Sequence, residues 1–231
     1  MGTAVNVFTQ AVEKIQIPPD EICLLSTGIG CTEKVKQYLD MQTHETTDKH
    51  FIDRSKKLMS ENPRLKLVLF LDDADFIVSG VELFVQAGVK GADVLIIYLN
   101  NYLYRIFKEH KVSKSIQGEA GNLEKRFGSP FNIPHLAKFC GAWNVARWTP
   151  HHPHRLSDSL IHALQRPGYS VVEVISPCLL YYNNIGMIGR PIDRKKMYEE
   201  QSVIKNGEPT ENLDLRAQER IIIGDFICRE D

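Results

Sequence analysis

The feature that most constrains the fold is a pair of continuous apolar runs separated by a segment of helix length. The runs are LKLVLFL at 65–71 and VLIIYL at 94–99, and FIVSGVELFVQAGV at 76–89 lies between them with helical spacing. A strand that is apolar on both sides has to be covered on both faces, as central strands of parallel sheets are. The pattern therefore predicts a βαβ unit in the core of an α/β domain.

Strand-like and helical segments alternate along most of the remaining chain. Apolar or β-branched runs indicate strands, apolar residues at helical spacing indicate helices, and glycine, proline and polar residues separate them. Strands are expected at 21–27 and 169–176, and helices at 5–15, in the second half of 38–64, at 133–142 and at 155–168. This order predicts an α/β fold, a mainly parallel sheet with helices on both faces.

The domain division follows from the spread of apolar residues. Across 231 residues there is no composition break, so we expect one large α/β domain at 1–182, with a polar surface excursion at 102–130. The segment 183–231 is strongly charged and is expected to be a C-terminal arm ending in a short strand, RIIIGDFI at 220–227. That strand could extend the sheet edge or pair with a partner subunit.

Composition narrows the classes of partner and location. The chain has 28 basic and 29 acidic residues with no basic stripe, so nucleic acid is not expected as a partner. No apolar run approaches the roughly 18 residues that span a bilayer, and a secretory pattern is missing, so we expect a cytoplasmic protein without membrane contact. The five cysteines form no CxxC pair and are expected to be reduced thiols: Cys23, Cys31, Cys140, Cys178 and Cys228.

An acidic cluster follows the first apolar run. Asp72, Asp73 and Asp75 stand where the chain leaves the predicted strand. Ligands of open α/β sheets bind beyond the carboxyl ends of the strands, so these carboxylates are candidates for a metal site. A solvated turn is the alternative, and this stretch alone favours it.

Five motifs in a fixed order carry a resemblance to a known family. They are STGIGC at 26–31, NPRLKLVLFLDDADF at 62–76, VLIIYLNN at 94–101, HPHRLSDSLIHAL at 152–164 and YSVVEVISPC at 169–178. Over roughly residues 5–182 the chain resembles the thiamine-diphosphate-binding β subunit of the 2-oxoacid:ferredoxin oxidoreductases. Their order and spacing together are more specific than any one motif. The resemblance implies the fold of a thiamine-diphosphate-binding domain.

The resemblance also implies a magnesium site and a cofactor site. In the family, a Gly-Asp-Gly-Asp turn and an Asn-Asn pair at neighbouring strand ends hold a Mg²⁺ bridged to the cofactor's diphosphate, which suits a hard ion that prefers oxygen ligands. The implied metal ligands are Asp73, Asn101 and the Leu103 carbonyl. The residues expected to contact thiamine diphosphate are Gly28, Gly30, Cys31, Asp73, Ala74, Asn101 and Tyr104. We assign no catalytic residue.

Several residues depart from the family's diphosphate-binding pattern. Asp72 and Ala74 stand in place of two glycines, and larger or charged residues replace small ones after the asparagine pair: Arg105, Phe107, Lys108 and Glu109. The family has a further phosphate-binding segment, His-Gly-Arg. His44 keeps the position of a first histidine, but Thr47, Asp48 and Lys49 stand where the His, Gly and Arg would be. Bulky residues block the close backbone approach that glycine permits, and a carboxylate repels a diphosphate. The sequence predicts a filled, degenerate site, although Arg105 or Lys108 could supply charge if the loop is rebuilt.

The iron-sulfur ligands of the family are also incomplete. The family's [4Fe-4S] cluster uses an amino-terminal CxxC, the cysteine of GIGC and the cysteine of SPC. This chain keeps Cys31 and Cys178 and begins just past the place where the CxxC would stand. Two thiolates do not complete a four-cysteine site, so we expect the cluster to be lost unless another chain donates ligands.

Two functions are compatible with these patterns. The first is a β-type subunit of a 2-oxoacid:acceptor oxidoreductase-like complex, which by resemblance converts a 2-oxoacid to an acyl-CoA with α- and γ-type partner subunits and with ferredoxin as a candidate electron acceptor. The second is a non-catalytic scaffold subunit that keeps the fold and the partner interface. Under both, a hetero-oligomer is expected, and the isolated chain is not expected to be catalytic.

Overall fold

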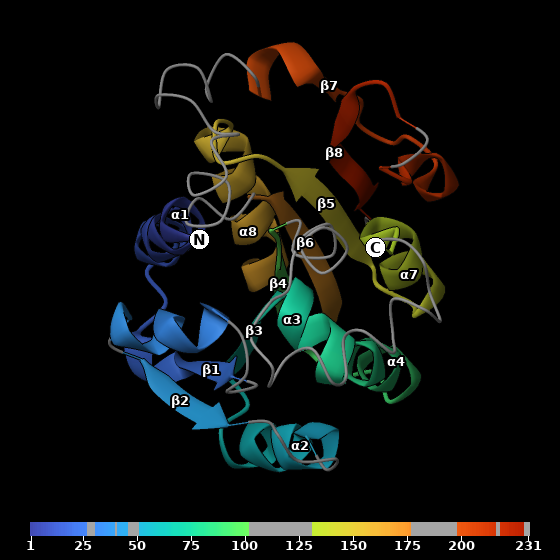
Figure 1. Ribbon diagram of the computed structural model, residues 1–231. Helices are drawn as coiled ribbons and strands as arrows, with labels where there is room; N and C mark the ends of the chain where they lie inside the picture. The colour runs from blue at the N-terminus through green and yellow to red at the C-terminus, as the bar shows by residue number, and fades with distance from the viewer. Residues whose placement is uncertain are drawn as a thin grey trace, which may run out of the picture.

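A twisted sheet runs through the part of the chain that the structure describes. In the computed structural model, this part comprises residues 1–26, 31–39, 41–45, 51–101, 131–176, 198–215 and 218–228. Figure 1 shows the sheet between two groups of helices. Several sequence-based predictions fall outside it, among them the excursion at 102–130, the domain boundary at 182 and the position of Cys178.

The sheet contains eight strands among the described residues, in the order β2-β1-β3-β4-β6-β5-β8-β7. They are β1 (Ile22–Ser26), β2 (Gln42–Glu45), β3 (Lys66–Asp72), β4 (Val94–Asn100), β5 (Asn144–Trp148), β6 (Tyr169–Ile175), β7 (Ser202–Ile204) and β8 (Ile221–Cys228). Strands β1 to β6 pair in parallel, whereas β8 runs antiparallel to β5 and carries β7 on its outer side. The prediction of a mainly parallel α/β sheet is confirmed.

The first apolar run is a central strand that is buried on both faces. Leu67, Leu69 and Leu71 of β3 pack into one hydrophobic core, and Val68 and Phe70 pack into the other. Successive side chains of a strand point to opposite faces, so a continuous apolar run serves both cores at once. The unbroken apolar character of this run, which is evident in the sequence, is therefore what places β3 between the two cores.

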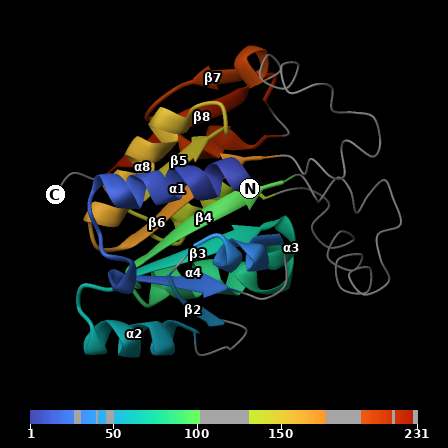
Figure 2. The same cartoon turned by 90° about the vertical axis from the view of Figure 1, so that its left-hand side faces the viewer.

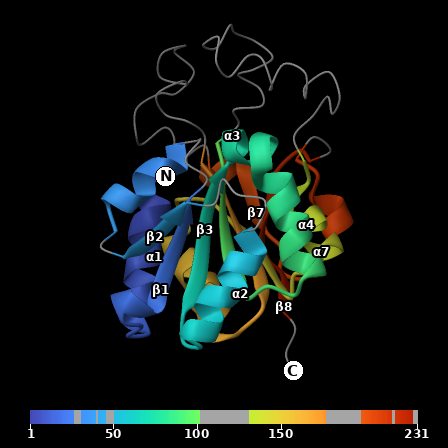
Figure 3. The same ribbon diagram turned by 90° about the horizontal axis from the view of Figure 1, so that it is seen from below.

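Helices cover both faces of the sheet (Figure 2 and Figure 3). On one face lie α1 (Gly2–Lys14) and α8 (Pro153–Gln165), and on the other lie α2 (Phe51–Glu61), α4 (Val81–Val89) and α7 (Ile133–Phe139). The shorter helical segments are the 3-10 turns η1 (Pro19–Glu21), η2 (Cys31–Gln37) and η4 (Thr210–Leu213). Among the described helices, none is long and apolar enough to cross a membrane.

The helix after β3 begins earlier than its apolar spacing suggests. We expected a helix at 76–89, but the chain turns directly from β3 into α3 (Asp73–Asp75), continues through a π-helical turn, η3 (Phe76–Gly80), and then enters α4. The acidic residues of the cluster thus form the first helical turn rather than a separate loop. The π-helical turn widens the helix next to the strand end, a position where such turns frequently accompany functional sites.

The C-terminal part of the described chain adds two strands to one side of the sheet. The strand expected at 220–227 is present as β8, and it pairs with β5 of the same chain, which is the sheet-edge alternative. Since β8 then carries β7, the segment after residue 198 contributes to the same sheet as the parallel strands. The proposed boundary at 182 itself remains a prediction.

Gly88 allows α4 to approach the end of α7 closely. A Cβ atom built at Gly88 of α4 would lie 1.6 Å from the carbonyl oxygen of Cys140, which follows α7. No side chain can occupy that space without moving the backbone of one helix. The glycine is therefore a packing requirement at this crossing.

We predict that Gly88→Ala lowers the free energy of unfolding by roughly 2 kcal/mol or more, because overpacking forces backbone shifts. Urea denaturation followed by circular dichroism measures the change. Gly2→Ala is the matched control, since a Cβ at Gly2 of α1 would meet nothing within 4 Å. Equal stability of the two variants would contradict the close approach.

Candidate functional site

The carboxyl end of β3 is held by a pair of reciprocal hydrogen bonds. The Asp72 carboxylate accepts from the backbone N–H of Ala74 at 2.9 Å and of Asp75 at 3.1 Å. The Asp75 carboxylate in turn accepts from the backbone N–H of Asp72 at 3.0 Å. The first N–H groups of a helix lack intrahelical partners, and this capping box supplies them. Two of the three clustered carboxylates thus begin the helix.

Asp72 also reaches the segments that follow the two neighbouring strands. Its Oδ2 atom accepts from the backbone N–H of Cys31 at 2.9 Å and from the Asn101 side-chain amide at 3.3 Å. Cys31 follows β1, and Asn101 follows β4 directly. Because β1, β3 and β4 are parallel neighbours, their carboxyl ends meet at one edge, and one carboxylate connects all three.

The other two carboxylates of the cluster are also engaged. Asp73 accepts a hydrogen bond from the Tyr98 hydroxyl at 2.6 Å, and Asp75 accepts one from the Thr32 hydroxyl. Asp72 is 1% exposed, and Asp73 and Asp75 are fully buried. The interpretation of this stretch as a solvated turn is therefore wrong, since the carboxylates face the interior of the sheet edge.

Burial changes the acidity of Asp72. The pKa of its carboxyl group is raised from 3.8 to about 7, chiefly by loss of hydration on burial and next by the nearby Asp75 carboxylate. The N–H groups of Asp75 and Cys31 work against this rise because they stabilise the charged form. Near neutral pH, Asp72 is therefore close to its midpoint between the neutral and ionised forms.

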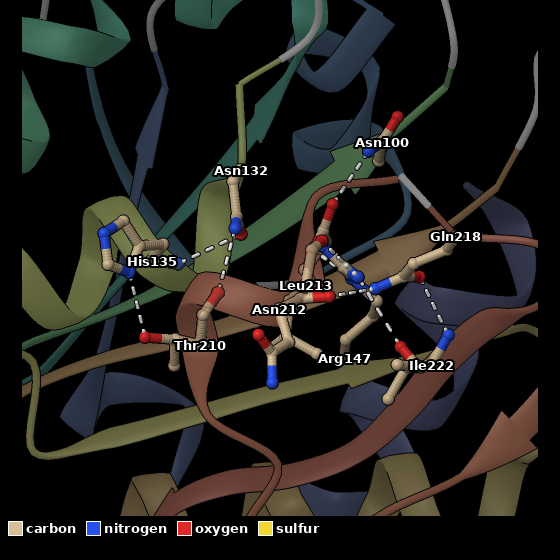
Figure 4. A network of polar contacts seen from close by, with 10 residues as sticks. Asn100, Asn132, His135, Arg147, Thr210, Asn212, Leu213, Gln218 and Ile222 are labelled. Carbon is tan, nitrogen blue, oxygen red and sulfur yellow. Dashed lines mark hydrogen bonds and ion pairs between the residues drawn. The ribbon is translucent and has the colours of Figure 1, made fainter. Parts of the chain in front are cut away.

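A second polar network lies beside this edge, inside the sheet (Figure 4). The Asn100 side-chain amide donates to Glu173 of β6 at 2.7 Å, and Arg147 Nε of β5 donates to the other Glu173 oxygen at 2.6 Å. Arg147 Nη1 donates to the Leu213 carbonyl at 3.0 Å. Both charged side chains are at most 1% exposed. The network thus links the last residue of β4 to the C-terminal segment.

Figure 4 also shows how the turn η4 is attached to α7. The Asn132 amide donates to the Thr210 carbonyl at 2.8 Å, and a ring nitrogen of His135 lies 3.1 Å from the Thr210 hydroxyl. These contacts hold the C-terminal segment against the same face that α4 covers. The Leu213 carbonyl is thereby kept in reach of Arg147.

The described residues bring part of the predicted site together. Cys31, Asp73, Ala74 and Asn101 all lie at the carboxyl edge formed by β1, β3 and β4. The other predicted site residues fall outside the described residues: Gly28, Gly30, Leu103 and Tyr104. Within the described residues no group of three or more His, Cys, Asp or Glu side chains is arranged around a common metal position. A metal held by Asp73 and Asn101 would draw its further ligands from elsewhere.

The buried pair Arg147 and Glu173 was not identified from the sequence. Each is a single charged residue within a short strand-like run, WNVARW or YSVVEVIS. A charge inside an otherwise apolar strand is a usable signal, because long charged side chains are rarely fully buried without a partner. Their pairing depends on the register of β5 and β6, in which Arg147 stands opposite Glu173.

Comparisons with known proteins place these features in context. The family described as "Thiamine pyrophosphate enzyme, C-terminal TPP binding domain" matches residues 55–174. The chain is 29% identical to the 2-oxoglutarate synthase subunit KorB of Methanothermobacter marburgensis, over 97% of this chain and 79% of that protein. It is 26% identical to the 2-oxoacid:ferredoxin oxidoreductase subunit beta of Saccharolobus solfataricus, over 74% of this chain and 57% of that protein.

A solved structure shares the fold across nearly the whole chain. The 2-oxoglutarate:ferredoxin oxidoreductase from Magnetococcus marinus superposes with a TM-score of 0.73 at 16% identity, covering 99% of this chain and 79% of that one. The match extends beyond the parallel strands, which means that the C-terminal strands belong to the shared architecture.

We predict that the stability of the metal-free protein falls as pH rises from about 4 to about 7, in part because of Asp72. Its pKa is higher in the folded protein than its usual 3.8, so its contribution is fully present below that value and is lost as pH rises through about 7. Asp72→Asn keeps a capping oxygen but does not titrate. It should therefore remove the Asp72 part of this fall in the free energy of unfolding, which is on the order of a few kcal/mol. Urea denaturation of both proteins across this range measures it.

The control for this experiment is Asp158→Asn on α8, whose carboxylate is 63% exposed. Its stability should follow that of the wild type at every pH. If the stability difference between wild type and Asp72→Asn is the same at both ends of the range, the assignment to Asp72 is incorrect.

We predict that Glu173→Gln destabilises the protein by about 3 to 5 kcal/mol, because it leaves the Arg147 charge buried without a counter-charge. Chemical denaturation gives the value. Glu33→Gln is the matched control, since its partner Lys36 lies on the surface in an i,i+3 pair and such pairs contribute little. A loss no larger than that of the control would mean that Arg147 is stabilised by carbonyl groups alone.

Proposed function

We propose that this chain serves in the oxidative decarboxylation of a 2-oxoacid to an acyl-CoA. The chain belongs to the thiamine pyrophosphate enzymes with a C-terminal TPP-binding domain, and among them to the β subunits of the 2-oxoacid:ferredoxin oxidoreductase family. The family resemblance carried by the motif order is thereby confirmed. The observation that supports the proposal most directly is similarity along 97% of the chain to a KorB subunit, with the strand-end residues Asp73 and Asn101 at one edge.

The proposed substrate is 2-oxoglutarate. Three relatives that match at least 97% of this chain are 2-oxoglutarate synthase subunits. The proposal includes α- and γ-type partner subunits and a cytoplasmic location. It also includes ferredoxin as the electron acceptor, because the names of other relatives contain it. No catalytic residue of this chain is proposed, and an α-type partner is expected to supply the carboxylate that activates the cofactor.

For the metal, the donor set fits. The proposed Mg²⁺ ligands are the Asp73 carboxylate, the Asn101 side-chain oxygen and the Leu103 carbonyl. Carboxylate and amide oxygens suit this hard ion, and a magnesium site built from adjacent strand ends is completed by substrate phosphates. The Tyr98 hydroxyl fixes one Asp73 oxygen at 2.6 Å, which orients the carboxylate. When bound, thiamine diphosphate supplies the electron sink for loss of CO₂ from a 2-oxoacid.

For the diphosphate, the described residues conflict with the proposed contacts. Gly28, Gly30, Cys31, Ala74 and Tyr104 would line the cofactor. The Cys31 N–H, which could donate to a phosphate oxygen, instead donates to the Asp72 carboxylate. An ionised Asp72 would repel the diphosphate at this range, and the family has glycine at its position. The Asp72 carboxylate therefore accepts the hydrogen bond that a phosphate oxygen could otherwise accept from Cys31.

This contact favours a second candidate function, the non-catalytic scaffold subunit. In that role the chain keeps the sheet and its partner surfaces, while a sister subunit carries the working site. The apolar residues of β3 and β4 still pack into both cores, while the polar groups at the carboxyl edge bond to one another. Both observations are consistent with a scaffold.

Copurification separates the two functions. The tagged chain, expressed with its genomic neighbours, is isolated as a complex and assayed for reduction of a viologen dye that depends on 2-oxoglutarate and coenzyme A. Turnover with bound thiamine diphosphate supports the catalytic subunit. A stable complex without cofactor or turnover supports the scaffold, and isolation of the chain without any partner would contradict both.

We predict that Asp72→Gly binds thiamine diphosphate with Mg²⁺ at least about tenfold more tightly than the wild type at about pH 8, because a buried negative charge is removed. Calorimetric titration measures the affinities, and glycine is tolerated at a helix N-cap. Asp73→Asn in the same background should weaken binding. Asp158→Ala on the surface of α8 is the control, and an affinity of Asp72→Gly equal to the wild type would show that Asp72 does not exclude the cofactor.

A further inference from the structure

A thiol and an imidazole meet at the end of the sheet opposite to the candidate site. Cys228 is the last residue of β8 and stands opposite Asn144, the first residue of β5. Since β5 is parallel to β3 and β4, its first residue lies at the amino edge, whereas Asp73 and Asn101 lie at the carboxyl edge. The two locations are separated by the length of the strands.

The contact itself joins two elements that are distant in sequence. Cys228 Sγ lies 3.5 Å from Nε2 of His162 and 3.9 Å from Nδ1, and the cysteine is exposed. His162 lies near the end of α8, so the contact joins this helix to the last residue of β8. At this distance the imidazole nitrogen can accept the thiol proton.

Neighbouring side chains restrict the imidazole. The Trp143 ring lies with its centroid 5.2 Å from that of His162, at an interplanar angle of 52°. The Arg166 guanidinium lies over the Trp143 ring, 6.0 Å from its centroid, so the indole is held by a second neighbour. A base whose ring is packed against an aromatic neighbour keeps its orientation toward the sulfur.

The other described cysteines differ from Cys228 in ways that matter for reactivity. Cys23 is fully buried within β1, and burial raises the pKa of the Cys140 thiol. Cys31 is exposed, but it lies beside the acidic cluster, where its backbone N–H donates to Asp72. A thiolate is the reactive form of cysteine, and a buried apolar or anionic setting disfavours it. Among these four, Cys228 alone contacts a histidine ring in the described part of the chain.

We propose that Cys228 and His162 form a thiol-modification site that reacts with small-molecule disulfides. In the reaction, His162 accepts the Cys228 proton while the sulfur attacks one sulfur of the disulfide. The disulfide S–S bond breaks, a new S–S bond forms at Cys228, and the second half of the disulfide leaves as a thiolate that takes up a proton. One disulfide and one thiol give one mixed disulfide and one thiol, so no further oxidant is required.

The site is independent of the proposed function. It uses neither the cluster at the carboxyl edge nor the network of Arg147, and its two residues lie on β8 and α8. Modification at Cys228 would add a group at the amino edge of β5, away from the candidate cofactor site.

The test uses the full chain and a dithiodipyridine, a small aromatic disulfide whose thiopyridone product absorbs light. Wild-type protein should react in a fast phase of one thiol, followed by slower phases. Cys228→Ser should lack the fast phase, and His162→Gln should slow it by about tenfold or more through loss of the base. Cys140→Ser is the matched control and should keep the fast phase.

Peptide mass spectrometry after the fast phase should find the mixed disulfide on Cys228. Thermal unfolding of each variant checks that its fold is intact, and His162→Phe provides a second variant that keeps a ring against Trp143 but removes the base. A fast phase that survives in Cys228→Ser, or an unchanged rate in both folded His162 variants, would overturn the proposal.

Discussion

The ion pair between Arg147 and Glu173 is the interaction on which the inner half of the sheet depends. Both residues are buried between helices, where an uncompensated charge would be costly. Their pairing requires β5 and β6 to keep a single register, and it orients Asn100 at the end of β4. The same guanidinium donates to the Leu213 carbonyl, so the C-terminal segment supplies one partner for a charge that the parallel strands carry.

The βαβ core was predictable because its signal is local. The continuous apolar runs of β3 and β4 serve two cores, and this demand is visible in the residues themselves. The antiparallel position of β8 was not predictable to the same degree, because an apolar strand can complete its own sheet or a partner's. The π-helical turn at Phe76–Gly80 also escaped prediction, since apolar spacing does not distinguish it from an ordinary helix.

The candidate site shows the same division between residue type and geometry. The replacement of glycine by Asp72 was evident in the sequence, and it predicted crowding near an anion. Its bonds to Cys31 and Asn101 could not be predicted, because they depend on how three strand ends converge. Arg147 and Glu173 were missed for a related reason: each is unremarkable alone, and only the register of β5 and β6 makes them a pair.

The Asp72 contact has a consequence for how this edge is maintained. The Cys31 N–H group already has an acceptor within its own chain, so it needs no dissolved anion to satisfy it. We therefore expect the ends of β1, β3 and β4 to keep these hydrogen bonds whether or not a cell supplies an anionic cofactor.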